Sequence, residues 1–324
     1  MAAMYLGSGP YCYASSLAMM LGPAAPEVGA IETLTGSPFG MQLVGGSQPY
    51  FDPYAWDPEI GVDAAVELLG FACERSHGGT PEEALGRLRA ACERGPVMAG
   101  PVDMALLPYT PGGGGDHYVV VLAVTDDPTA GAAGLVGGTP GSAAGDGGGG
   151  TVVVHDPHGH PFATLPVADF LAAWRADAVE YLDTSYVMRT GFVRVRRTSV
   201  TRALHDSLPA AARWLEGRDD LPVPPGTLGG ADAALRLAEL VAGGLGPDVR
   251  GLLTHFGVRV GARRLADAAT WLGSVGRAEA AAVAERQARV LGTLQLPLVT
   301  GDDAAVVAGL RRLAPGYAAL RAAL

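Results

Sequence analysis

Two β-branched runs separated by a glycine-rich segment place the strongest constraint on how this 324-residue chain folds. Residues 117–124 read HYVVVLAV and residues 151–155 read TVVVH, and such runs are typical of buried strands. Between them, the segment 128–150 has ten glycines among its 23 residues. It has too few apolar side chains to order itself by burial. We therefore expect an antiparallel hairpin that carries a disordered insertion at its tip.

Further helices and strands are predicted on both sides of this hairpin. Thr80-Pro81-Glu82-Glu83 combines an N-cap residue, a proline at the first helical position and acidic residues in the first turn, which indicates a helix running to about residue 94. Other helices are expected at 14–21, 62–69 and 167–175, and other strands at 71–75, 96–99 and 179–197.

The chain changes character near residue 200. Pro222-Val223-Pro224-Pro225-Gly226 interrupts it, and Ala-, Leu- and Arg-rich segments with helical spacing follow. The fold class predicted is α+β, with a mixed α/β domain over residues 1–200 followed by an all-α domain over 201–324. The helical segments of the second domain are expected at 231–242, 263–272, 277–291 and 302–324.

Composition excludes several classes of function. The formal charge is −10, and all 23 basic residues are arginine, so nucleic-acid binding through a general positive field and lysine-based chemistry are excluded. Neither a cationic leader nor an apolar run long enough to span a membrane is present in the sequence. The three cysteines form no CxxC pair. These features predict a cytoplasmic protein with free thiols and no membrane partner.

Cys12 is the candidate nucleophile. It directly precedes the predicted helix 14–21, and free N–H groups at a helix start lower the pKa of a thiol in general. The alternative is that Cys12 is a small buried apolar residue, as most free cysteines are. Cys73 and Cys92 lie inside predicted elements and are interpreted as structural.

His117 and Asp156 are the candidate partners of this nucleophile. His117 starts the first strand of the hairpin and Asp156 follows the last residue of the second, so pairing of the strands would bring both side chains to one end. Cysteine catalysis needs a base and a group that orients the base. Because the chain contains no asparagine, an acidic residue is the obvious orienting group. The alternative is that His117 merely marks a strand edge.

The sequence resembles a known family at several short motifs. The pattern of a cysteine at a helix start, Gly-Pro-Val before the histidine strand, HYVVV and VVHDP looks like a papain-like fold of the bacteriocin-leader-peptidase type. It is most similar to the N-terminal domain of the butirosin-biosynthesis acyltransferase family. Further similarity lies at SPFG (37–40), VDMALLPY (102–109), FLAAW (170–174) and Arg263-Arg264 before AATW (268–271).

The resemblance implies a cysteine acyltransferase of natural-product biosynthesis. An acyl group would pass from the phosphopantetheine arm of an acyl carrier protein to Cys12, and from there to an amine or another small-molecule acceptor. His117 would be the base and Asp156 its orienting group. Neither a cofactor nor a metal is implied.

One feature departs from the papain-like pattern. The stretch from Met4 to Tyr11 contains no glutamine to stabilise the oxyanion, so Gln42, Gln48, Ser8 or a backbone N–H group must serve instead. Asp103 and Tyr109 either line the pocket or only close a loop. The other candidates for oxyanion stabilisation or substrate binding are Tyr11, Tyr13 and Phe39.

Rival interpretations remain open. The same triad would serve a peptidase or thioester hydrolase, and a scaffold that only binds a partner would have an inert Cys12. A metal site at His155, Asp156, His158 and His160 is disfavoured, because neighbouring strand residues point to opposite faces. The helical half is predicted either to cover the Cys12 cleft and form the acceptor pocket or to form a homodimer. A carrier protein could dock at the basic patch, which consists of Arg194, Arg196, Arg197 and Arg202.

Overall fold

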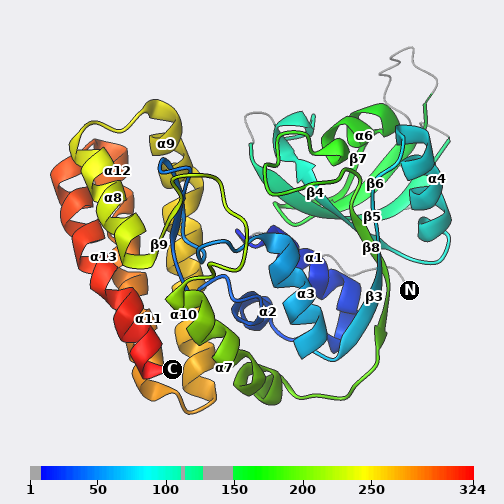
Figure 1. Cartoon of the computed structure of the whole chain (residues 1–324). Helices are drawn as coiled ribbons and strands as arrows, with labels where there is room; N and C mark the ends of the chain where they lie inside the picture. Colours follow the sequence, from blue (N-terminus) through cyan, green and yellow to red (C-terminus); the bar gives the residue numbers. More distant parts are fainter. Residues whose placement is uncertain (1–8, 111–113, 127–148) are drawn as a thin grey trace. The chain divides into compact units, whose positions relative to one another are not determined.

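The computed structural model describes residues 9–110, 114–126 and 149–324, and these residues form two compact units (Figure 1). The first unit combines the chain up to residue 25 with residues 71–195, and the second combines residues 26–70 with residues 196–324. The expected change near residue 200 is therefore present. The assignment of all residues 1–200 to one domain was wrong, because residues 26–70 belong with the helical unit.

A six-stranded antiparallel sheet forms the centre of the first unit. The predicted hairpin is confirmed, because β5 and β6 pair with Val121 opposite Val154. Residues 127–148, which contain most of the predicted insertion, lie outside the described part of the chain. The strands, in their order across the sheet, are β3 (Phe71–Ser76), β8 (Met188–Arg194), β4 (Val97–Asp103), β5 (Asp116–Thr125), β6 (Thr151–Asp156) and β7 (His160–Pro166).

Helices of the first unit cover the sheet. The helix α4 (Pro81–Cys92) starts with the predicted capping box, in which Thr80 and Glu83 each bond the other's backbone N–H. Its apolar face shares a core with the sheet and with α6 (Val167–Arg175). The helix α1 (Cys12–Leu21) packs against β5 and β4, and short turns η1 (Gly22–Ala24) and η2 (Met104–Leu106) complete the unit.

The strand predicted over residues 179–197 is shorter than expected. Only Met188–Arg194 is a strand, because Tyr186 adopts a positive φ angle of 57°. A left-handed residue cannot continue an extended strand. The indole of Trp174 instead donates a hydrogen bond of 2.7 Å to the carbonyl of Val187, which anchors this turn to the core.

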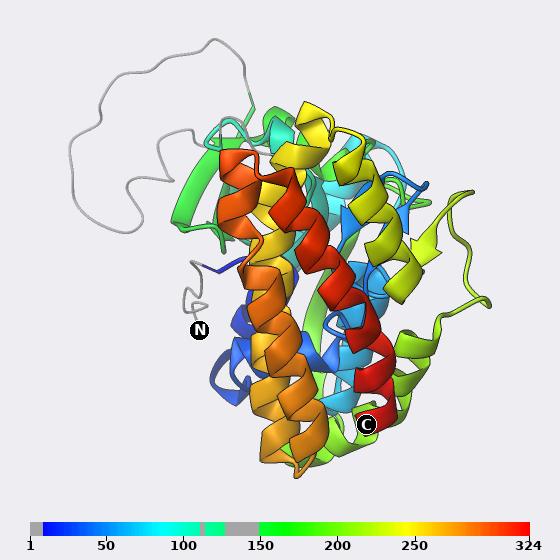
Figure 2. The ribbon, with the colours of Figure 1, turned by 90° about the vertical axis from the view of Figure 1, so that its left-hand side faces the viewer.

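The second unit is mainly helical, as predicted for the C-terminal part of the chain. Figure 2 shows its long helices α10, α11 and α13 side by side. A small antiparallel sheet of β2 (Gln48–Tyr50), β1 (Gln42–Val44) and β9 (Leu228–Gly229) joins the segment 26–70 to the C-terminal helices. The helices are α2 (Val28–Leu34), α3 (Pro58–Leu68), α7 (Val200–Glu216), α8 (Gly230–Ala242), α9 (Pro247–Leu252), the π-helical turn η3 (Leu253–Gly257), α10 (Val258–Ser274), α11 (Ala278–Gly292), α12 (Gln295–Thr300) and α13 (Asp303–Ala323).

A buried ion cluster explains why residues 26–70 belong to the second unit. The guanidinium of Arg264, on α10, bonds Glu32 through Nε at 2.8 Å and Asp52 through Nη1 at 3.0 Å. Nη1 also donates to the carbonyl of Phe51, and the guanidinium lies over the ring of Trp56. Buried charges need such partners. The cluster therefore fixes the segment 26–70 on the helical bundle.

Helix length and hydropathy bear on a membrane location. Within residues 9–110, 114–126 and 149–324, no helix combines the length and the apolar character that crossing a membrane requires.

Candidate functional site

The first unit brings His117 and Asp156 into direct contact. His117 is the second residue of β5 and Asp156 is the last residue of β6, and the two strands are antiparallel neighbours. Nε2 of His117 lies 2.8 Å from Oδ1 of Asp156, and the two residues are 1% and 0% exposed. The strand pairing inferred from sequence thus places the two side chains as expected.

Cys12 is the third member of this group. It is the first residue of α1, is half-buried, and lies close enough to His117 for a hydrogen bond between the side chains to raise the pKa of the imidazole. Because Nε2 of His117 faces Asp156, Nδ1 is the ring nitrogen left to face the sulfur. The structure therefore assembles all three predicted residues within one unit.

The electrostatics of His117 favour the imidazolium. Burial alone would lower its pKa, but the hydrogen bonds and charges of Asp156 and Cys12 outweigh burial and raise the pKa to about 10. Its ring also lies 5.0 Å from that of His158, centroid to centroid. At neutral pH His117 is positively charged and can stabilise an anion beside it.

Asp156 is held as a carboxylate. Burial would raise its pKa, but His117 and the backbone N–H of His158 lower the pKa below the ordinary value. The backbone nitrogen of His158 lies 2.7 Å from Oδ1 of Asp156, and this hydrogen bond closes a turn over Asp156-Pro157-His158. The contact of the turn with Asp156 was not predicted, although Asp-Pro is a recognisable turn signal.

A hydrogen bond between α1 and β5 sets the position of Cys12. The hydroxyl of Ser16, one turn after Cys12, donates to the carbonyl of Tyr118 at 3.2 Å, and both residues are 0% exposed. Tyr118 is the neighbour of His117 in the chain. The bond thus ties the helix that carries the thiol to the strand that carries the imidazole. Sequence reasoning missed Ser16, although its helical spacing from Cys12 places the two on one face.

The other cysteines differ in surroundings from Cys12. Cys73 lies in β3 and Cys92 ends α4, and both are half-buried free thiols. Burial raises the pKa of Cys92 to about 11, so that it remains a neutral thiol at physiological pH. This supports the structural interpretation of Cys92.

Two predicted candidates, Gln42 and Phe39, take structural roles in the second unit. Gln42 Nε2 donates to Asp52 and to the carbonyl of Trp56, while its Oε1 accepts from the N–H of Ala55. Both amide hydrogens are therefore in use, and the prediction that Gln42 donates to an oxyanion was wrong. Phe39 is 1% exposed, and its contact with a substrate stays a prediction.

The remaining candidates beside Cys12 are mostly parts of the framework. Tyr13 is buried and meets the ring of Tyr118 edge to face, with centroids 6.1 Å apart. Tyr11 is the N-cap residue of α1 but gives no side-chain hydrogen bond to the first helical turn. The backbone N–H groups of that turn are the donors that remain for an oxyanion. Ser8 lies outside the described residues, and Gln48 is exposed on β2 of the second unit.

Asp103 and Tyr109 have separate roles. Asp103 caps the turn η2 by accepting a hydrogen bond of 2.9 Å from the N–H of Ala105, which supports the loop-closing alternative for this residue. Tyr109 instead lies beside the strand pair of Asp156, because its ring centroid is 5.3 Å from that of His160, the residue opposite Asp156 in β7.

The histidines of β6 and β7 contact aromatic neighbours. Nδ1 of His155 accepts the N–H of Phe162, whose ring lies 4.4 Å away, and His160 packs edge to face on Tyr109. Across the described ranges, no group of three or more His, Cys, Asp or Glu side chains could hold a metal ion.

The arginines of the basic patch have local partners. The guanidinium of Arg194 lies over the ring of Phe71, Arg196 donates to the carbonyl of Glu67, and Arg202 forms an ion pair with Asp206. Arg197 is exposed. Arg194 belongs to the first unit and the other three arginines belong to the second, and carrier docking at this patch stays a prediction.

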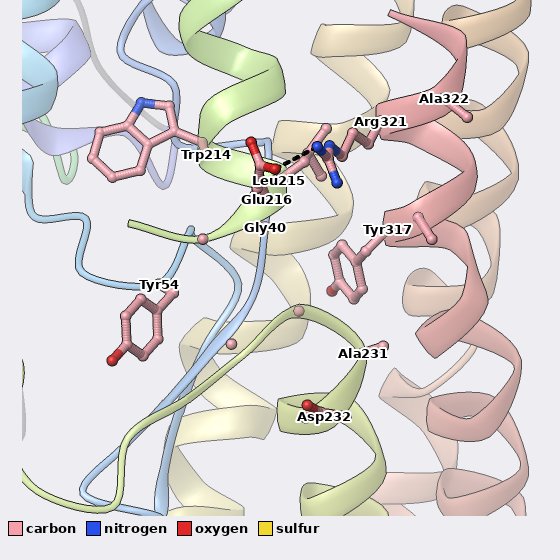
Figure 3. Close-up of a pocket in the computed structure, with 14 residues that line it drawn as sticks. Gly40, Tyr54, Trp214, Leu215, Glu216, Ala231, Asp232, Tyr317, Arg321 and Ala322 are labelled. Carbon is pink, nitrogen blue, oxygen red and sulfur yellow. Dashed lines mark hydrogen bonds and ion pairs between the residues drawn. The ribbon is translucent and has the colours of Figure 1, made fainter. Parts of the chain in front are cut away.

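A cavity of about 610 Å³ lies within the second unit. The ends of α7, α8 and α13 and two loop residues line it (Figure 3). Tyr317 extends from α13 toward its centre in this view, and the ion pair between Glu216 and Arg321 spans two of its walls at 2.6 Å. The volume is that of a small-molecule site, and the residues around the cavity do not include Cys12, His117 or Asp156.

Comparison with known proteins gives matches to part of the chain. The YobF C-terminal domain family model matches residues 224–324, which contain β9 and the helices α8 to α13. The uncharacterized protein YobF of Bacillus subtilis (strain 168) is 26% identical over 181 residues, covering 55% of this chain and 52% of the relative. The chain thus matches about half the length of that relative. The C-terminal helices of this chain are similar to the YobF C-terminal domain, and Cys12, His117 and Asp156 lie outside the matched family range.

Proposed function

We propose that the first unit is a cysteine-dependent acyltransferase with Cys12 as its nucleophile. The observation that carries the proposal is the position of Cys12 at the start of α1, beside a buried imidazole that is hydrogen-bonded to Asp156. An imidazolium next to a cysteine stabilises the thiolate, which is the reactive form. Asp156 in turn orients His117 and stabilises its positive charge.

In the first step, the Cys12 thiolate attacks the carbonyl carbon of a thioester. The bond from that carbon to Cys12 Sγ forms, and the bond to the sulfur of the donor breaks. His117 donates its proton to the leaving thiolate and becomes neutral. The N–H groups of the first turn of α1 would stabilise the negative oxygen that develops.

In the second step, an amine attacks the acyl-enzyme. The new C–N bond replaces the C–S bond, neutral His117 takes the proton that the amine loses, and Cys12 leaves as the thiolate. The imidazolium–thiolate pair is thereby restored. If water attacks in place of the amine, the same steps give hydrolysis, which is the runner-up function.

The fold supports the proposal. A helix that begins at the nucleophile packs against an antiparallel sheet whose neighbouring strands carry the base and its orienting group. We propose that this arrangement is papain-like. Together with the motif resemblance to the butirosin-type family, it favours a carrier-protein thioester as the acyl donor.

The decisive experiment uses the full chain and a panel of acyl-pantetheine thioesters. Intact-mass measurement should detect a covalent acyl adduct on the protein, and Cys12→Ala should abolish it completely while circular dichroism shows an unchanged fold. Cys73→Ala is the matched control and should retain the adduct. Iodoacetamide at neutral pH should also label Cys12 faster than Cys73 or Cys92.

The outcomes separate the three functions. An adduct that an amine discharges to an amide supports transfer, and an adduct lost only to water indicates a hydrolase. If no thioester acylates the protein and Cys12 is no more reactive than Cys73, a non-catalytic scaffold replaces the proposal.

A further inference from the structure

Tyr109 lies in a loop whose conformation is fixed by its own hydrogen bonds. The hydroxyl of Thr110 donates to the carbonyls of Met104 and Leu107, at 3.2 and 3.1 Å. Asp103 holds the start of the same loop through the N–H of Ala105. The loop therefore presents Tyr109 in one orientation.

The ring of Tyr109 lies beside the strand pair that carries Asp156. Its centroid is 5.3 Å from that of His160, and His160 is the residue directly opposite Asp156 in the pairing of β6 and β7. The ring also packs on the apolar core of the first unit. These contacts place the side chain close to the buried carboxylate.

The hydroxyl of Tyr109 is buried and is a donor in need of an acceptor. Among the described residues it forms no hydrogen bond of standard geometry, and an unpaired buried hydroxyl is unfavourable. Burial and the Asp156 carboxylate both raise the pKa of the hydroxyl. It therefore keeps its proton at every pH at which the protein would act, and a carboxylate is the acceptor it lies near.

We propose that Tyr109 is a positioning residue that donates a hydrogen bond to the Asp156 carboxylate and so orients Asp156 toward His117. The proposal rests on the proposed function of Cys12. Oδ1 of Asp156 already meets His117 and the N–H of His158. A further donor would prevent rotation of the carboxylate about its last bond, as outer partners do for other catalytic groups.

The first test compares Tyr109→Phe with the wild type. This change removes the hydroxyl and keeps the ring contact with His160. The rate of Cys12 alkylation by iodoacetamide, followed by peptide mass spectrometry, should fall several-fold at neutral pH. The rate of Cys12 alkylation should also be measured as a function of pH. The midpoint that reflects loss of the His117 proton should move to lower pH, because a less well oriented carboxylate stabilises the imidazolium less. Tyr186→Phe, in the same core, is the control and should leave rate and midpoint unchanged.

The second test is a double-mutant cycle with Asp156→Asn. If Tyr109 acts through Asp156, adding Tyr109→Phe to Asp156→Asn should change the alkylation rate and the midpoint no further. An equal loss in both backgrounds would overturn the proposal, as would a Tyr109→Phe protein that matches the wild type or does not fold. These outcomes presuppose that iodoacetamide alkylates Cys12 of the wild type rapidly. A slow wild-type Cys12 would instead contradict the proposed function.

Discussion

The two units each bury a group of interacting charges, and the two groups differ in what they can do. In the first unit, His117 and Asp156 meet at the end of a strand pair, next to a half-buried cysteine. In the second, the guanidinium of Arg264 is enclosed by Glu32 and Asp52. Burial is almost complete in both, so burial alone does not distinguish a candidate reaction site from a structural ion cluster.

The two groups differ in whether they can exchange a proton and in which side chains lie beside them. An arginine keeps its charge at all relevant pH values and can only bind. A histidine can give and take a proton, and here it has a half-buried cysteine beside it. The comparison predicts that disrupting the cluster of the second unit affects stability, whereas disrupting the pair of the first affects reactivity. Each of the following experiments tests one side of this contrast.

The largest expected effect is on the cluster of the second unit. Arg264→Met would leave Glu32 and Asp52 buried without their counter-charge, and breaking a buried pair in this way costs about 3–5 kcal/mol of unfolding free energy. Urea denaturation measures the loss. Arg263→Met is the matched control, because its ion pair with Asp267 is exposed and such pairs contribute about 0–1 kcal/mol. Equal losses in the two variants would contradict the structural role of Arg264.

The next effect is on reactivity in the first unit. Asp156→Asn keeps the shape of the side chain but removes the charge that stabilises the His117 imidazolium, so the rate of Cys12 alkylation at neutral pH should fall on the order of 10²-fold. Competition between Cys12 and Cys73 peptides in mass spectrometry gives the ratio directly. If Asp156→Asn kept the alkylation rate of the wild type, Asp156 would not be part of the site. Some residual reactivity is expected, because an orienting residue is less essential than the nucleophile.

The pH dependence of stability should also separate the two groups. His117 has its pKa raised from 6.5 to about 10 in the folded protein, so the stabilisation is complete below about 6.5 and is lost as the pH rises toward about 10. The slope is at most about 1.4 kcal/mol per pH unit. The difference in unfolding free energy between the wild type and His117→Gln, measured in urea, should shrink across this range. The corresponding difference between the wild type and Arg264→Met should stay constant, since arginine does not titrate there. A difference for His117→Gln that did not vary with pH would mean that His117 is neutral in the folded protein.

Local patterns in the sequence were enough to predict the contact between His117 and Asp156. The β-branched runs specify the pairing of β5 and β6, and that pairing alone brings His117 and Asp156 together across 39 positions. The capping box at Thr80 and the helix that follows Cys12 likewise depend on residues close in sequence. Such features can be predicted from sequence because hydrophobic periodicity and helix capping depend on residues that are close together in the chain.

What the sequence could not predict depends on contacts between distant side chains. Glu32 and Arg264 are 232 positions apart, and nothing near either residue indicates its partner. The assignment of residues 26–70 to the second unit and the role of Gln42 both follow from contacts within that unit. Gln42 resembled a free oxyanion donor only because its three partners are not visible in the local sequence.

The smallest expected effect concerns Ser16, and it tests whether a contact can matter for position more than for stability. Ser16→Ala removes the buried hydrogen bond to the carbonyl of Tyr118, which should cost about 1 kcal/mol of unfolding free energy. Ser207→Ala is the matched control in the second unit, because Ser207 is also buried and its hydroxyl donates to the carbonyl of Leu204, 2.8 Å away in its own helix. The two variants should lose similar stability in urea. Only Ser16→Ala should also slow Cys12 alkylation, by a few-fold, because only the bond of Ser16 ties the helix of the thiol to the strand of the imidazole. If both variants left Cys12 equally reactive, the register of α1 on β5 would have to be set by packing alone, with Tyr13 against Tyr118 as its main contact.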